Sequence, residues 1–303
     1  MKIRMQMEKI KAVCFGEVLW DVFPNHKKIG GAPLNVALRM NSLGIDTSVI
    51  SQVGKDKNGE EIRDYLKNSG ISVDAVSSTS NYPTGEVQVI LNEKGSASYE
   101  IKHPAAWDKI EVSKTKVDIT KKSDVFIFGS LVCRDEISRN TLFELLKTAT
   151  YKVFDINLRP PHYKKEVLEH LLRSSNFVKF NDDELFEISE MMGSKFNSLE
   201  QNIKFIAKTF LPNTICVTKG NHGAVLFHKE KWYYNSGYKI KVKDTVGAGD
   251  SFLASLITKL LQKEDPQTAL DFACAMGALV AGSNGANPEI TMLQIQDFMF
   301  PEQ

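Results

Sequence analysis

The stretch DTVGAGDSFLASLITKLL, residues 244–261, places two glycines, an alanine and an aspartate directly before an apolar segment with helical spacing. A helix N-terminus leaves backbone N–H groups without partners and carries partial positive charge. Glycines let a phosphate approach that backbone closely, so Gly247, Ala248 and Gly249 can form an anion hole. Asp250 is then either a capping carboxylate or a base that takes a proton from an attacking hydroxyl. The second interpretation meets the needs of phosphoryl transfer to an alcohol.

The composition is that of an ordinary globular protein. The chain has 303 residues, of which 42% are apolar and 25% are charged. Its 38 lysines and arginines nearly balance its 37 aspartates and glutamates, for a formal net charge of +1. That balance argues against a nucleic-acid or acidic-membrane partner, because either would favour a strongly basic surface.

The cysteines and the apolar runs indicate a compartment. The four cysteines lie far apart and include no C-x-x-C pair, which favours reduced thiols over a zinc site or a disulfide framework. The start MKIRMQMEKIKAVCFGEVL carries charges up to Lys11 and lacks the apolar core of a signal peptide. No run approaches the roughly 18 apolar residues of a membrane span. We therefore expect a soluble cytoplasmic protein.

Short apolar runs alternate with helical patterns along most of the chain. We predict strands over residues 12–16, 46–54, 124–130, 151–158, 177–181 and 214–220. We predict helices over residues 33–44, 60–70, 136–149, 164–174, 182–192 and 199–210. This alternation indicates a single α/β domain over residues 1–303, built on a doubly wound, mostly parallel sheet with helices on both faces.

Two segments depart from this alternation. GEVQVILNEKGSASYEI (85–101) alternates apolar and polar residues on either side of the turn NEKG, which predicts a hairpin. With EVLWDVFP (17–24) it would form a small β-layer, from insertions at about 17–30 and 84–104. This layer would be a lid over a ligand or a surface for a second subunit, and the alternative is an edge extension of the main sheet. A second hairpin is expected around Trp232, Tyr233 and Tyr234.

A second glycine motif lies near the N-terminus. IGGAPLNVA (29–37) puts Gly30 and Gly31 before a helix, with Asn35 one turn in. The motif is either a turn and helix start, or a place where a polyhydroxylated ligand touches glycine backbone while the Asn35 amide binds a hydroxyl. Together with GAGDSF (247–252) it resembles the two signature motifs of the ribokinase-like (PfkB) sugar kinases. The resemblance runs from about residue 12 to about residue 290. GEVLWDVFP, GGAPLNVA, SYEIKHPAAW and FDINLRPPHY are most similar to the fructokinase branch.

The resemblance implies a ribokinase-like fold and an ATP-dependent kinase that phosphorylates a primary hydroxyl of a sugar, converting D-fructose to fructose 6-phosphate. The implied cofactors are ATP and Mg²⁺, with K⁺ as a further candidate, and we expect a homodimer through the lid. A ribokinase, a 2-keto-3-deoxygluconate kinase and a nucleoside kinase share the chemistry and remain alternatives, as does a catalytically silent sugar-binding protein. A nicotinamide-dependent dehydrogenase is disfavoured, because FGEVLWD offers one glycine where G-x-G-x-x-G is required.

The resemblance also implies roles at the sugar end of the site. Asp21 would accept hydrogen bonds from sugar hydroxyls, and Gly30, Gly31 and Asn35 would complete the pocket. Lys102, on the strand that leaves the hairpin, would also reach the sugar.

The segment DINLR implies a phosphate contact. It places Asp155, Asn157 and Arg159 at alternating positions where a predicted strand ends, and ligands of open α/β sheets bind beyond those ends. Arg159 would bridge the transferred phosphate, since a planar guanidinium suits phosphate oxygens. The alternative for Arg159 is a surface salt bridge.

The remaining implied roles concern the nucleotide and the ions. Asn181 and Glu184 match the family's Asn-x-x-Glu element, and Glu184 would hold the Mg²⁺–phosphate assembly through water. Asp244 is a candidate ligand for a monovalent cation. The residues implied to line the nucleotide, besides Asn181, are Thr218, Lys219, Gly220, Gly223, Thr245, Gly285 and Ala286.

Overall fold

A nine-stranded sheet forms the centre of the part of the chain that the computed structural model describes, residues 9–91 and 97–301. Its order is β13-β12-β11-β10-β9-β8-β1-β4-β5, and neighbouring strands are parallel except in the β11–β12 and β12–β13 pairs. The strands are β1 (Lys11–Phe15), β4 (Asp46–Gly54), β5 (Val76–Thr79), β8 (Val125–Gly129), β9 (Lys152–Asp155), β10 (Phe177–Asn181), β11 (Thr214–Thr218), β12 (Ala224–His228) and β13 (Lys231–Asn235). The predicted mostly parallel sheet is confirmed, and so is the hairpin around residues 232–234.

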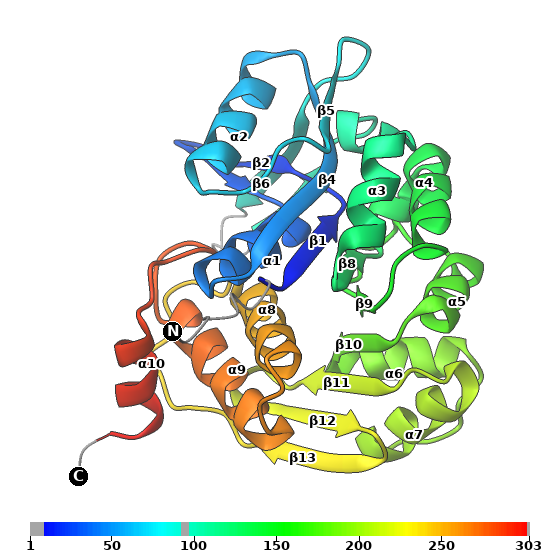
Figure 1. The fold of residues 1–303 in the computed structure, drawn as a ribbon. Helices are drawn as coiled ribbons and strands as arrows, with labels where there is room; N and C mark the ends of the chain where they lie inside the picture. The colour runs from blue at the N-terminus through cyan, green and yellow to red at the C-terminus, as the bar shows by residue number, and fades with distance from the viewer. Residues whose placement is uncertain (1–8, 92–96, 302–303) are drawn as a thin grey trace, which may run out of the picture.

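Helices cover both faces of this sheet, as Figure 1 shows. On one face lie α1 (Ala32–Ser42), α2 (Lys57–Asn68), α8 (Ala248–Leu261) and α9 (Pro266–Ala281). On the other lie α3 (Lys114–Lys122), α4 (Glu136–Leu146), α5 (Lys165–Ser174), α6 (Asp182–Met191) and α7 (Leu199–Phe210). α10 (Met292–Met299) packs beside α9. Successive side chains of the central strands point to opposite faces, so these strands are mostly apolar on both sides and separate two hydrophobic cores.

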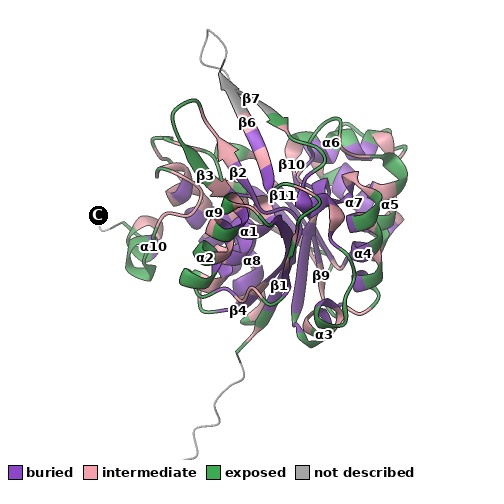
Figure 2. Cartoon of the chain, turned by 90° about the horizontal axis from the view of Figure 1, so that it is seen from above, coloured by how far each residue is buried: buried purple, intermediate pink, exposed green. Residues whose placement is uncertain are grey.

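Four further strands form a separate sheet with the order β3-β2-β6-β7. They are β2 (Leu19–Val22), β3 (Lys27–Gly30), β6 (Gly85–Leu91) and β7 (Ala97–Ile101). In Figure 2, β6 and β7 extend away from the body of the molecule. The small β-layer is therefore not an edge extension of the main sheet. The predicted turn NEKG at residues 92–95 and the charged start at residues 1–8 lie outside the described residues.

Two predicted strands end earlier than expected, and one polar helix was not predicted. The predicted strand 151–158 ends at Asp155, because Asn157 adopts a left-handed backbone with φ of 41°, so Asn157 and Arg159 belong to a loop. The predicted strand 214–220 likewise ends at Thr218, and Gly220–His222 form a short 3₁₀ turn, η3. The sequence analysis missed α3, whose sequence KTKVDITKK is mostly polar and offers little apolar periodicity.

Within the described ranges, no helix combines the length and the apolar character needed to cross a membrane.

Candidate active site

The site lies where the chain changes direction across the sheet. From β1 the chain passes through the second sheet to β4 on one side of β1, whereas β8 to β13 follow on the other side. In open α/β sheets such a switch point leaves a crevice beyond the carboxyl ends of the strands. The segments that follow β1, β8, β9, β10 and β11 all begin at this edge of the sheet.

The glycine loop before α8 has the geometry of an anion hole. Gly247 is the N-cap of α8 with φ of 75°, a left-handed conformation that favours glycine. A Cβ on Gly247 would lie 2.5 Å from Cβ of Ala286, so the loop also has no room for a larger residue. No side chain caps this helix end within the described part of the chain. The N–H of Ala248 donates a long hydrogen bond of 3.3 Å to the carbonyl of Thr245, so the N–H groups that follow it in the first turn are the ones available to an anion.

Asp250 is held by a side chain from the other end of the sequence. Nδ2 of Asn35 on α1 donates to Oδ2 of Asp250 at 2.8 Å, and Nδ2 of Asn287 donates to Oδ1 of Asn35 at 2.8 Å. Asn35 is only 5% exposed, so this chain of amides has a defined orientation. Because Gly247 is the N-cap and Asp250 bonds to Asn35, the interpretation of Asp250 as a capping carboxylate is wrong.

The environment tunes Asp250 for proton transfer. Desolvation and the charge of Asp155 raise its pKa to about 6, while the hydrogen bond from Asn35 and the charges of Lys179 and Arg159 act in the opposite direction. A carboxyl with a pKa near 6 is ionised at neutral pH and is a stronger base than an ordinary aspartate. Asp250 can therefore accept a proton from a hydroxyl in the crevice.

A buried ion pair beneath the glycine loop was not predicted from the sequence. Lys179 on β10 lies directly opposite Asp155 on β9, and its Nζ is 2.8 Å from Oδ1 of Asp155. The same Nζ lies 3.7 Å from the position that a Cβ on Gly249 would occupy. Burial disfavours the Lys179 ammonium, but the negative charges of Asp155, Glu184 and Asp250 raise its pKa. The signal was a lysine in the middle of the apolar strand FVKFN.

The residues predicted to bind the sugar lie in the second sheet and at the start of α1. Asp21 on β2 has its pKa raised to about 6 by burial, against the opposing charges of Arg159 and Lys28. Its carboxylate lies against Gly30, where a Cβ would clash with Oδ2, and a Cβ on Gly31 would clash with the backbone of Glu17. Gly31, the N-cap of α1 with φ of 114°, is therefore required by its backbone conformation and by close packing, whereas a side chain on Gly30 would displace the Asp21 carboxylate.

Glu17 is a second functional candidate that the sequence analysis missed. It lies two residues after the end of β1, is 4% exposed, and its Oε2 has no hydrogen-bond partner in residues 9–91 and 97–301. Burial raises its pKa to about 7, while the charge of Arg159 opposes this shift. An acid two residues after the apolar strand AVCF was the available signal.

Arg159 faces the acidic groups of the site. Its positive charge lowers the pKa of Asp250, Asp21 and Glu17. Its Nη1 donates to the carbonyl of Leu158 at 2.8 Å. The described residues contain no salt bridge to Arg159, which argues against the surface salt-bridge interpretation. A guanidinium in this position can contact a phosphate in the crevice.

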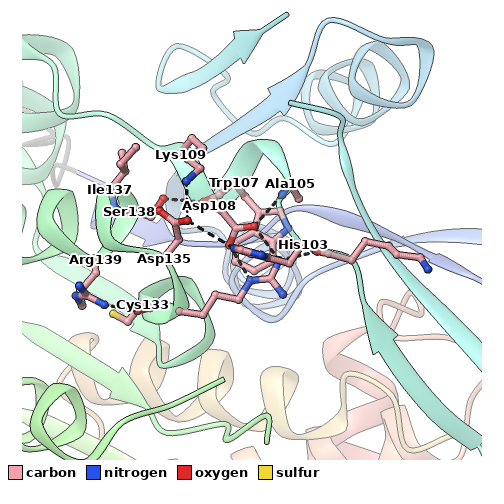
Figure 3. Close-up of polar contacts among 12 residues, drawn as sticks. His103, Ala105, Trp107, Asp108, Lys109, Cys133, Asp135, Ile137, Ser138 and Arg139 are labelled. Atoms are coloured by element: carbon pink, nitrogen blue, oxygen red, sulfur yellow. Dashed lines mark hydrogen bonds and ion pairs between the residues drawn. The ribbon is translucent and has the colours of Figure 1, made fainter. Parts of the chain in front are cut away.

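Lys102 points elsewhere. Its Nζ forms an ion pair with Glu100 at 2.9 Å, and the Lys102 side chain is 47% exposed. Arg134 holds the adjoining backbone, because its Nη2 donates to the carbonyl of Lys102 at 2.6 Å while its Nε pairs with Asp108 at 2.7 Å. Figure 3 shows Asp108, Trp107 and His103 gathered at this exit from the second sheet. The structure thus does not bring Lys102 into the group around Asp250.

The nucleotide-side residues divide into three groups. Oδ1 of Asn181 accepts from N–H of Glu184 at 2.7 Å, and the two Glu184 oxygens accept from the backbone of Leu158 and Asn181 at 2.9 and 2.8 Å. Glu184 thereby ties α6 to the loop that carries Arg159. Burial raises the pKa of Glu184, and Lys179 opposes this shift.

Asp244 links the glycine loop to the last loop of the site. Its Oδ1 accepts from N–H of Val246 at 3.0 Å and its Oδ2 accepts from N–H of Gly285 at 3.1 Å. Thr245 lies in the same loop, and its carbonyl accepts from N–H of Ala248 at 3.3 Å. Asp244, Thr245, Gly285 and Ala286 are therefore packed around the start of α8.

The segment after β11 is only partly available to a ligand. Gly220 has φ of 54° and open space around it, and Lys219 stands beside it without a side-chain hydrogen bond in the described residues. Oγ1 of Thr218 donates to the carbonyl of Phe180 at 3.3 Å. Gly223 packs against the backbone of Asn235 with φ of 77°, so the conformation of the β12–β13 hairpin accounts for this glycine.

Comparison with known proteins agrees with this geometry. Residues 3–292 match the pfkB family carbohydrate kinases. The probable chloroplastic fructokinase-6 of Arabidopsis thaliana is 28% identical over 310 residues, which cover 92% of this chain and 79% of that protein.

Two solved structures share the fold. A fructokinase of Xylella fastidiosa with bound ATP has a TM-score of 0.83 and 21% identity, and the match covers 95% of this chain and 98% of that one. A double-mutant fructokinase of Vibrio cholerae O395, bound to fructose, ADP and a potassium ion, has a TM-score of 0.82 and 23% identity, over 96% and 98% of the two chains. Since the family match spans nearly the whole sequence, the chain belongs to the pfkB family of carbohydrate kinases.

Proposed function

We propose that the protein is an ATP-dependent fructokinase, which transfers the γ-phosphoryl group of ATP to the 6-hydroxyl of D-fructose. The observation that carries this proposal is the contact between Asn35 and Asp250. It holds a carboxylate with a pKa of about 6 on the first turn of α8, beside an uncapped glycine loop. A base and an anion hole at one helix start are what phosphoryl transfer to an alcohol requires.

In the proposed reaction, Asp250 takes the proton of the primary hydroxyl. The hydroxyl oxygen then forms a bond to the γ-phosphorus, and the bond from that phosphorus to the β-phosphate oxygen breaks to release ADP. The N–H groups of Gly247, Ala248 and Gly249 would donate hydrogen bonds to the negatively charged phosphoryl oxygens during transfer, and Arg159 would contact the same oxygens. The Lys179 ammonium adds positive charge beneath this loop.

Fructose is favoured as the acceptor by the fructokinases among the relatives and by the polar groups at the end of β1. Asp21, the backbone of Gly30 and Gly31, and Asn35 would bind the sugar hydroxyls, and Asn35 would also orient Asp250. A contact from Lys102 to the sugar would require its ion pair with Glu100 to break. The second sheet would close over the sugar as a lid that excludes water.

The proposed nucleotide contacts come from Asn181, Thr218, Lys219, Gly220, Gly223, Thr245, Gly285 and Ala286. The donor set suits Mg²⁺, because both Glu184 oxygens keep a lone pair beyond their backbone hydrogen bonds and can bind a water of the hydrated ion. When bound, Mg²⁺ would neutralise charge on the β- and γ-phosphates. We assign K⁺, as a further candidate, to the loop of Asp244, whose carboxylate lies between two backbone segments.

We further propose a homodimer through the second sheet and a cytoplasmic location. The sheet has two edge strands, β3 and β7, which can pair with or pack against another copy. The cysteines of the chain are all free and buried, as expected for a reducing compartment. Sedimentation velocity with and without fructose would test the assembly.

The deciding experiment measures ATP consumption by the purified protein across fructose, ribose, 2-keto-3-deoxygluconate and adenosine. We expect fructose to be preferred by about a hundredfold in kcat/KM, or about 2.7 kcal/mol of discrimination, and we expect chelation of Mg²⁺ to abolish turnover. Preference for another acceptor would retain the kinase and contradict the fructose assignment. No turnover with any acceptor would contradict the kinase proposal and favour a sugar-binding protein.

A further inference from the structure

A second pocket lies next to the loop that carries Arg159. It has a volume of about 500 Å³, including space open to solvent, and lies between the turn η2 (Leu131–Arg134), α4 and the start of α5. The side chains that characterise it are Arg134, Arg139, His162, Lys164, Val167 and Leu168. None of the residues placed above in the phosphoryl-transfer site lines this pocket.

The charged side chains that line the pocket are all basic, and its other titratable residues are Cys133 and Tyr163. Arg134, Arg139, His162 and Lys164 line it, and no carboxylate from the described residues does. The charge of Arg134 is already neutralised, because its Nε and Nη2 pair with Asp108 at 2.7 and 2.8 Å. Its guanidinium also stacks over the Trp107 ring. The charges of Arg139 and Lys164 are the unbalanced ones.

Arg139 and Lys164 have few competing partners. In the described ranges, the one side-chain hydrogen bond of Arg139 is a long one of 3.4 Å from Nη1 to the carbonyl of Cys133, visible in Figure 3. Lys164 forms no ion pair in the same ranges. Lys164 is also the N-cap residue of α5, and its side chain cannot accept hydrogen bonds, so the positive end of this helix adds to the field, while Glu166 in the first turn opposes it.

We propose that this pocket binds the phosphate group of a small phosphate ester, at a site separate from the one that handles phosphoryl transfer. Two unpaired cations match a phosphate dianion, and the Arg139 guanidinium can bind two of its oxygens. Val167 and Leu168 on one wall would contact the carbon skeleton of the ester.

The pocket is connected to the active site through one loop. N–H of His162 donates to the carbonyl of Arg159 at 2.8 Å, and Oγ of Ser130 donates to the carbonyl of Asn157 at 3.4 Å. A bound ester would therefore restrain the loop that positions Arg159. When the ester is released, the loop would keep its hydrogen bonds from Ser130 and His162.

The proposal is tested by calorimetric titration of the full chain with glycerol 3-phosphate, with and without a non-hydrolysable ATP analogue and Mg²⁺. We expect one saturable site in both conditions. Arg139→Gln and Lys164→Gln should each weaken binding by about tenfold, the effect of one charge-assisted hydrogen bond. Lys165→Gln is the matched control, since Lys165 is the exposed neighbour and does not line the pocket.

Three results would overturn the proposal. The first is no binding by the unsubstituted protein. The second is unchanged affinity in the Lys164→Gln variant; Lys164 is exposed, so this substitution should not disrupt folding. The third is binding that disappears with the ATP analogue, because that anion would occupy the active-site loop. Titration with acetate separates the ligand classes: equal affinity for acetate would contradict the phosphate assignment. The readout is binding, so it does not depend on whether fructose is the substrate.

Discussion

Replacement of Lys179 by methionine should destabilise the protein strongly. The Nζ of Lys179 lies 2.8 Å from Asp155, and the two side chains are 8% and 6% exposed. Oδ2 of Asp155 is already buried without a partner in residues 9–91 and 97–301. The Lys179→Met variant would leave the Asp155 carboxylate buried without its cation. The cost of breaking such a pair is about 3–5 kcal/mol, a large part of the roughly 5–15 kcal/mol of a typical domain.

A matched control comes from an ion pair of the same length near the surface. Nζ of Lys259 lies 2.8 Å from Glu264, but these side chains are 13% and 35% exposed. Because water screens and solvates this pair, Lys259→Met should cost at most about 1 kcal/mol. The comparison separates burial from distance as the cause of the effect.

Urea unfolding, followed by circular dichroism, measures both free energies of unfolding. The double variant Lys179→Met with Asp155→Leu should recover much of the loss, because it removes both charges instead of one. A loss below about 1 kcal/mol for Lys179→Met alone would refute the reasoning, since it would mean that Asp155 is solvated or protonated without difficulty. No recovery in the double variant would refute it as well.

Four predictions concern catalysis. Asp250→Asn should lower kcat by roughly 10²–10⁴, measured as ATP consumption, and normal turnover would remove Asp250 as the base. Since the base must be ionised, kcat/KM should fall as the pH drops through about 6, the pKa of Asp250. Asn35→Ala should move this acid limb upward by about one pH unit, because the ionised form loses a hydrogen bond worth about 1.5 kcal/mol, and an unmoved limb would contradict the role of Asn35. Gly247→Ala should lower kcat by about a hundredfold, because a Cβ there meets Ala286 at 2.5 Å and displaces the anion hole. Near-normal kcat in the same assay would contradict this prediction, because it would mean that displacement of the loop does not impair the anion hole.

Local patterns in the sequence determined much of the fold. The alternation of apolar runs and helical periods predicted the parallel sheet and most of the helices around it, and the alternation in residues 85–101 predicted a separate hairpin. These features follow from neighbouring residues, since strand and helix periods are set by which side chains face a core. The polar helix α3 and the left-handed Asn157 carry no such pattern and were missed.

The sequence also identified part of the site. The glycine loop and Asp250 were recognisable because the order of residues along one helix start already implies an anion hole beside an acid. Such reasoning requires only contiguous residues. It extended to Gly30, Gly31 and Asn35, which lie at the start of another helix.

Only the tertiary structure decided which of these groups meet. Asn35 and Asp250 are 215 residues apart and share one hydrogen bond. This contact orients the Asp250 carboxylate as a base, so Asp250 does not serve as a helix cap. Asp155 and Lys179 face each other because β9 and β10 are neighbours in one register, whereas Lys102 pairs with Glu100 away from the group around Asp250. The register and packing of distant segments depend on the whole core, so no local stretch of sequence specifies which charges come together or how far water is excluded from them.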